Sequence, residues 1–301
     1  MSWAKYKRLS SSKDLSIFRR GTTASDGSGS DGPLLDVYGG AAAAYSLRQL
    51  SGNYAGSAIR VRRSSDNAEQ DIGFSDGLLD TASLSSFCGA DNGFVTSWYD
   101  QSGNSNNATQ ITAINQPRIY DSSTGLITLG GQPALDFNSS FDFFVDYLNM
   151  PNFSTFQNVT VASVIGDLLS SNFPRVYDLY DGANHLQFLF DNFSTYYVKY
   201  DLWQAGLNAT SFGPIVTTHQ LNFLLATNGA NTLYNNNTAP SASPVTGAGS
   251  AGAISKIGAR ADLNNQTFMQ GKFQELVIYQ LDQTANRLGI QNNINSHYNI
   301  Y

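Results

Sequence analysis

The sequence predicts a single all-β domain, a sandwich of two antiparallel sheets with short peripheral helices. Short apolar runs recur along the chain and are separated by clusters of Gly, Asn, Asp and Ser, as in strands joined by turns. Hydrophobic residues make up 41% of the 301 residues, and 18 Phe and 16 Tyr supply apolar surface for a core. No repeat of about 20 to 50 residues is evident, which argues against propellers and solenoids.

Three segments are expected along the chain. Residues 1–20 form a basic tail with six of the 17 Lys and Arg residues and one acidic residue, which gives this tail a net charge of +5. Residues 21–33, GTTASDGSGSDGP, contain no apolar side chain larger than Ala and predict a flexible linker. Residues 34–301 form the sandwich, since β-sandwiches run to about 200–250 residues as one unit.

The charge of the remaining chain is opposite to that of the tail. Residues 21–301 hold 11 basic and 22 acidic residues, a net charge of −11, so this part is expected to repel nucleic acid. The tail either docks on an acidic surface of a partner or is a solvated terminus, and the sequence leaves both open.

Alternation and turn residues place the expected strands. Residues 58–63 alternate apolar and basic side chains, which predicts Ile59 and Val61 in the core and Arg60 and Arg62 outside. Further strands are expected at residues 94–99, 133–137, 159–165, 175–180, 185–190, 195–200, 215–225, 232–234, 254–257 and 272–280. The sequence Asn-Gly-Ala at residues 228–230 predicts a hairpin.

Two short helices are expected at the periphery. Residues 41–48 place Ala and Tyr side chains at helical spacing and predict the first of them. Residues 283–298 show a similar spacing of Leu, Ile and Tyr, which predicts a terminal helix packed on a sheet edge.

Several classes of protein are excluded or disfavoured by composition. Cys88 is alone, so no intrachain disulfide forms, and no apolar run approaches the ~20 residues of a membrane span. The basic N-terminus lacks the apolar segment of a signal peptide, so no secretory route is expected. His185, His219 and His297 lie far apart, so neither a Cys/His metal site nor a cofactor is expected; calcium in the Asp-rich turns is left open.

The chain has few glutamates that could act as catalytic carboxylates. Glu69 and Glu275 are the two in the chain, and Glu275 lies within FQELVIY, where it points into a cleft, lies on a solvated face or is a paired strand charge. Most of the 21 aspartates lie in turns, where such side chains accept backbone hydrogen bonds. No nucleophile elbow accompanies the histidines, so a Ser-His-Asp triad is not expected.

Aromatic residues suggest a glycan-binding surface. Sugars stack on aromatic rings and hydrogen-bond to amides and carboxylates, and Trp203 lies close to Tyr196, Tyr197 and Tyr200 in the sequence. The alternative is that these rings belong to the core or to a sheet face.

Three stretches resemble a known family. They are AYSLRQLSGNYAGSAIRVRRSSDNAEQDIGF, the following segment that ends at Phe87 and Cys88, and WYDQSGNSNNATQ from Trp98 to Gln110. In order and spacing, over residues 35–137, they resemble the catalytic domain of the fungal α-L-arabinofuranosidase B type. Similar segments occur in phage-encoded concanavalin A-like modules. The resemblance implies a concanavalin A-like jelly roll, and IGARAD followed by GKFQELVIY is similar to its closing strands.

The resemblance also implies site residues. The family's nucleophilic glutamate lies in a His-apolar-Glu strand, and the matching residues here are His185, Leu186 and Gln187. An amide does not attack an anomeric carbon, so a retaining mechanism is expected to be lost. The family's acid/base aspartate matches Asp262. Cys88 matches one cysteine of a family disulfide whose partner position is Gly93 here, and the adjacent-cysteine pair of the family's sugar pocket has no counterpart.

These observations predict a non-enzymatic virion protein, a phage tail, fibre or capsid decoration protein, with Trp203, His185, Gln187 and Asp262 as glycan-binding residues. Its expected partners are other virion proteins, bound through residues 1–20, and a cell-surface glycan; self-association is left open. Neither nucleic acid nor membrane insertion is expected. The alternatives are an active glycosidase of the arabinofuranosidase type and a decoration protein without a ligand.

Overall fold

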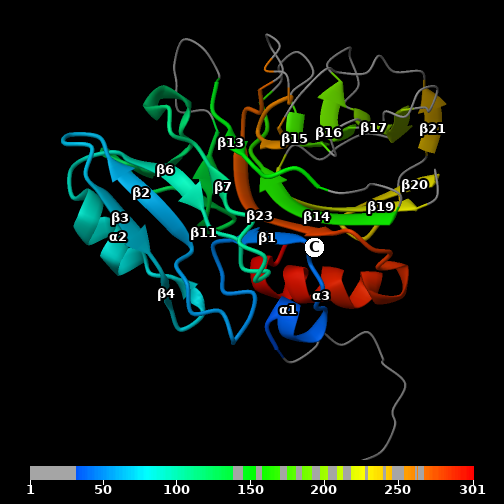
Figure 1. Cartoon of the computed structure of the whole chain (residues 1–301), viewed down its shortest axis with the longest axis horizontal. Coiled ribbons are helices and arrows are strands. Elements are labelled where there is room, and N and C mark those ends of the chain that lie inside the picture. The colour runs from blue at the N-terminus through cyan, green and yellow to red at the C-terminus, as the bar shows by residue number, and fades with distance from the viewer. Residues whose placement is uncertain are drawn as a thin grey trace, which may run out of the picture.

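The computed structural model describes an all-β sandwich, which confirms the predicted fold class (Figure 1). The described residues are 32–137, 145–153, 158–169, 175–180, 185–191, 197–202, 209–212, 218–227, 230–239, 242–245, 254–261, 263 and 268–301. The predictions for the tail at 1–20 and for most of the linker therefore lie outside them.

Two antiparallel sheets stack on each other. The lower sheet in Figure 1 has β23 (Lys272–Tyr279) at its centre. One side of β23 pairs with β1 (Ala43–Ser46) and β12 (Leu135–Asp136), and the other continues through β14 (Asn158–Gly166), β19 (Gln220–Thr227) and β20 (Ala230–Asn235).

The upper sheet is longer and curves across the molecule. Its strands, in order of pairing, are β3 (Glu69–Ile72), β2 (Ile59–Arg63), β6 (Gly93–Trp98), β7 (Ala108–Thr109), β13 (Leu148–Asn149), β22 (Lys256–Ile257), β15 (Arg175–Tyr180), β16 (His185–Asp191), β17 (Tyr197–Leu202), β18 (Ala209–Phe212) and β21 (Ala242–Val245). The strand β8 (Arg118–Asp121) pairs with both β6 and β12 and so joins the two sheets.

Short elements complete the described chain. They are α1 (Leu34–Val37), β4 (Phe74–Ser75), β5 (Leu78–Leu79), α2 (Thr81–Cys88), η1 (Ala113–Asn115), β9 (Gly125–Leu126), β10 (Thr128–Leu129), β11 (Gln132–Pro133), η2 (Thr284–Asn286) and α3 (Arg287–Tyr298). Figure 1 shows α1 and α3 beneath the lower sheet and α2 beside β2 and β3.

The core has two layers, one on each face of the lower sheet. The layer between the sheets includes Phe273, whose ring contacts those of Trp98 and Phe137. The second layer lies between the lower sheet and the helices α1 and α3, and it includes Phe223 and Ile290. The lower sheet is therefore covered on both faces, which removes its strands from water.

Most predicted strands are confirmed, including the inward side chains of Ile59 and Val61, which are fully buried. The prediction of a helix over residues 41–48 is wrong, because residues 43–46 form β1. All four β1 residues are buried, with Ala43 and Tyr45 in one core layer and Ala44 in the other. Burial on both faces and pairing with β23 outweigh the helix propensity of alanine.

The predicted hairpin and the predicted terminal helix are both confirmed. Strands β19 and β20 pair in register up to Thr227 and Ala230, which confirms the hairpin, although residues 228 and 229 lie outside the described chain. The terminal helix is confirmed as α3. It covers the face of the lower sheet at β19 instead of a sheet edge, because Ile290 and Ile294 pack into the second core layer.

The DQSGN motif, residues 100–104, forms a loop that hydrogen-bonds to the edge of β1 that does not pair with β23. The Asp100 carboxylate accepts hydrogen bonds from the backbone amides of Ala44 at 2.8 Å, Ser102 at 2.9 Å and Asn106 at 2.9 Å. The Gln101 side chain donates to the carbonyls of Ser46 and Arg48 and accepts from the amide of Leu50. Because both side chains are almost fully buried, the motif supplies the hydrogen bonds that a neighbouring strand would otherwise provide.

Replacing Asp100 with Ala is therefore expected to lower the free energy of unfolding by about 3 kcal/mol, because several buried backbone amides lose their acceptor. Urea unfolding measures this change. Asp282→Ala is the matched control, because Asp282 accepts from the amide of Thr284 at an exposed turn, and it should cost less than about 1 kcal/mol. Equal losses in the two variants would contradict the structural role of the motif.

Candidate functional site

A row of polar side chains crosses the upper sheet on the face turned away from the core. The row is defined by cross-strand partners in register: Gln187, Asp178, Lys256, Asn149, Thr109, Ser97 and Arg60. The neighbouring positions on the same strands, Phe188, Tyr177, Ile257 and Leu148, all belong to the core between the sheets. Since side chains alternate along a strand, the row lies on the opposite face. We call it the polar row.

At one end of the polar row, a buried carboxylate gathers three donors. Asp178 Oδ1 accepts from His185 Nδ1 at 2.8 Å, and Oδ2 accepts from Gln187 Nε2 at 2.7 Å and from the backbone amide of Ala261 at 2.8 Å. Asp178 is fully buried, and His185 and Gln187 are 2% exposed. We call these four residues the Asp178 cluster. It draws on β15, β16 and the segment that follows β22.

The hydrogen bonds fix the chemistry of the cluster. The Asp178 carboxylate accepts a hydrogen bond from Nδ1 of His185, so that nitrogen carries a proton. The Tyr180 ring lies against the imidazole with 4.7 Å between centroids. The cluster therefore combines an imidazole, a carboxamide and a carboxylate beside an aromatic ring, a combination that suits a sugar's hydroxyls and CH faces.

Two of the four predicted site residues meet in this cluster. His185 and Gln187 lie two residues apart on β16 and share the Asp178 carboxylate. Trp203 and Asp262 lie outside the described residues. Asp178 was missed by the sequence analysis; it lies three residues before the sequence Asp181-Gly182, and its cross-strand partner is Gln187.

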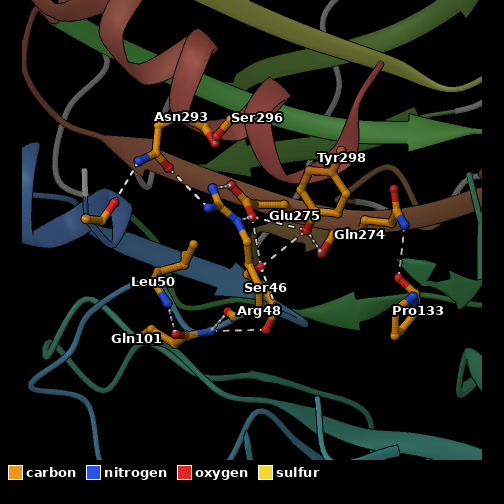
Figure 2. Close-up of polar contacts among 11 residues, drawn as sticks. Ser46, Arg48, Leu50, Gln101, Pro133, Gln274, Glu275, Asn293, Ser296 and Tyr298 are labelled. Carbon is orange, nitrogen blue, oxygen red and sulfur yellow. Dashed lines mark hydrogen bonds and ion pairs between the residues drawn. The ribbon is translucent and has the colours of Figure 1, made fainter. Parts of the chain in front are cut away.

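Glu275 lies on β23 of the lower sheet, on the face covered by α3, and not at the polar row; Figure 2 shows it between Arg48 and Tyr298. Its carboxylate pairs with Arg48 through Nε at 2.8 Å and Nη2 at 3.0 Å, and Ser46 and Tyr298 also donate to it. Burial is the largest single influence and raises the pKa of Glu275, but the charge of Arg48 and the hydrogen bonds from Arg48 and Ser46 together hold this pKa below its usual value. Of the alternatives for Glu275, the paired strand charge is confirmed.

His297 on α3 lies beside this ion pair. Burial and the nearby Arg48 charge lower the pKa of His297 to about 4. The unfolded chain therefore binds a proton at His297 between about pH 6.5 and 4 that the folded chain does not, so stability is present above pH 6.5 and falls as pH drops through this range. Unfolding free energies measured from pH 7 to 4 should show this loss. His297→Gln should reduce the slope, and an unchanged slope would contradict the assignment.

The single cysteine is buried and free. A Cβ built on Gly93 would lie 2.6 Å from the Sγ of Cys88, so the two positions are direct neighbours, as the resemblance implied for a disulfide position. Burial raises the pKa of Cys88 to about 11, which keeps the thiol protonated and unreactive near neutral pH.

Comparison with known proteins adds a family relationship for part of the chain. Residues 36–136, about a third of the sequence, match the family model of the α-L-arabinofuranosidase B catalytic domain. No protein of curated function matches the sequence significantly. The matched region includes β1, β2, β6 and the DQSGN loop, and it ends before the Asp178 cluster begins.

Solved structures extend the similarity to most of the fold. The chain matches a GH54 α-L-arabinofuranosidase soaked with a cyclic sulfate inhibitor, with a TM-score of 0.62 and 17% identity. It also matches an arabinofuranosidase complexed with arabinofuranosyl-α-1,2-xylobiose, with a TM-score of 0.59 and 16% identity. Both alignments cover 84% of this chain and 62% of the other, so the chain spans less than two thirds of these proteins. At this identity the similarity shows a shared β-sandwich fold.

The described part of the chain lacks both a membrane-spanning helix and a clustered metal site. It contains no helix that is long and apolar enough to span a membrane. It also contains no group of three or more His, Cys, Asp or Glu side chains arranged to hold a metal ion.

Proposed function

We propose that this chain is an arabinofuranosidase-like glycoside hydrolase domain whose sugar site is the Asp178 cluster. The single observation that carries the proposal is a buried carboxylate that orients an imidazole and a carboxamide on the sheet face away from the core. The family match over residues 36–136 and the shared fold of two arabinofuranosidases support a pentofuranoside as the ligand.

Hydrolysis of a glycoside needs two carboxyl groups, about 5–5.5 Å apart for retention and about 6.5–9.5 Å apart for inversion. We assign Asp178 as one and Asp262 as the other, because Asp262 directly follows Ala261, whose amide donates to Asp178. We propose that Asp178 accepts a proton from an attacking water and that Asp262 protonates the leaving oxygen.

A second candidate is a glycan-binding module without hydrolase activity, carried by a virion and anchored through the basic residues 1–20. Gln187 supports it, because the resemblance places a carboxamide where the family has its nucleophile. The Asp178 cluster has the donors and acceptors for sugar binding in either case, so the two candidates share a site and differ in turnover.

One assay separates the candidates. Release of 4-nitrophenol from 4-nitrophenyl α-L-arabinofuranoside, together with calorimetric binding of arabinotriose, is measured on the full chain. Turnover that Asp262→Asn abolishes supports the hydrolase. Binding without turnover supports the glycan-binding module, and the absence of both overturns the proposed site.

A further inference from the structure

Lys256 is a buried cation in the middle of the polar row. It is 4% exposed and lies between Asn149 and Asp178, its partners on β13 and β15. Its ammonium donates to Asn149 Oδ1 at 2.7 Å and lies 5.0 Å from the centroid of the Tyr147 ring. These two neighbours hold the ammonium in place without neutralising it.

Lys256 forms no ion pair with a carboxylate of the described residues. Asp178 is its nearest acidic strand neighbour, but the Asp178 oxygens already accept from His185, Gln187 and Ala261. Burial lowers the pKa of Lys256, and the attraction of Asp178 opposes this shift. Burying an ammonium is costly unless an anion or several acceptors meet it, and within the described chain one amide oxygen accepts a hydrogen bond from Lys256.

We propose that the glycan bound at the Asp178 cluster contains a uronic acid, and that the Lys256 ammonium binds its carboxylate. The inference rests on the proposed function and names the class of its ligand. Among the described residues the Lys256 ammonium donates to Asn149, which leaves two N–H donors for such a carboxylate, and Tyr147 beside them offers a ring face to the sugar. Neutral pentosides would use the Asp178 cluster alone.

The test is calorimetric titration of the full chain with trigalacturonate, its trimethyl ester and arabinotriose. The ester has the shape of the acid without its charge. A hydrogen bond between charged groups contributes about 1.5–3 kcal/mol, so the acid should bind roughly 10- to 100-fold more tightly than the ester. Lys256→Met should reduce this ratio to less than about 2-fold, because the ammonium is the source of the preference.

Lys272→Met is the control, because Lys272 pairs with Asp167 away from the row, and it should keep the full preference. A wild-type ratio near one, or a ratio that Lys256→Met leaves unchanged, overturns the inference. If arabinotriose binds and Asp178→Asn abolishes that binding while the acid has no advantage, the inference falls and the proposed site stands. If none of the three sugars binds, both fall.

Discussion

Glu275→Gln is expected to lower the free energy of unfolding by about 3–5 kcal/mol. The substitution removes the charge that neutralises Arg48, whose guanidinium is buried under α3 and bonded to both oxygens of the carboxylate. It also weakens the acceptor for Ser46 and Tyr298. Chemical denaturation monitored by tryptophan fluorescence measures this loss of stability. We expect it to arise from weaker packing of α3 against β23 and β1.

The surface pair Arg60–Glu69 is the matched control. Its N–O distance of 2.6 Å is shorter than the 2.8 Å of Arg48–Glu275, but both side chains are more than a third exposed. Glu69→Gln should therefore cost less than about 1 kcal/mol. A second check is Arg48→Met combined with Glu275→Gln, which removes the buried charge and should be less destabilising than the sum of the two single changes. Additive losses would contradict a coupled pair.

Asp178→Asn is expected to weaken sugar binding roughly 10- to 100-fold, because His185 and Gln187 lose the charged acceptor that orients them. If the chain hydrolyses arabinofuranosides, the rate should fall further, by about 100-fold or more, because the proton acceptor is gone. Calorimetry with arabinotriose and the nitrophenol assay measure the two effects separately.

Glu275→Gln also serves as the control for Asp178→Asn, because both replace a fully buried carboxylate by an amide. We expect opposite outcomes for the two variants at a temperature where both remain folded. Glu275→Gln should keep sugar binding and lose stability, whereas Asp178→Asn should lose sugar binding. Equal effects on binding would mean that Asp178 contributes through general stability and not through the site.

The sandwich was predictable because its signals are local. Turn residues and the alternation in residues such as Ile59 and Val61 mark strands whatever their neighbours are. The strand β1 was missed because its hydrogen bonds come from β23 and from the DQSGN loop, which are distant in sequence. Alanine-rich sequence with its partners out of view has the pattern of a helix.

The candidate site was predictable in part for a related reason. His185 and Gln187 were identified from a resemblance to a three-residue pattern, and the structure brings both to one carboxylate. Asp178 and Lys256 were missed, because their importance comes from register across β15 and β22. The strongest sequence motif, DQSGN, supports the scaffold, so the part of the chain that matches the family model is not the part that holds the proposed site.

The most direct test of the central claim is a crystal structure of the chain soaked with arabinotriose. We predict a sugar ring on the outer face of the upper sheet, with hydroxyl groups hydrogen-bonded to His185 or Gln187 and its CH face toward Tyr180. A sugar bound elsewhere, with the Asp178 cluster unchanged and untouched, would contradict it.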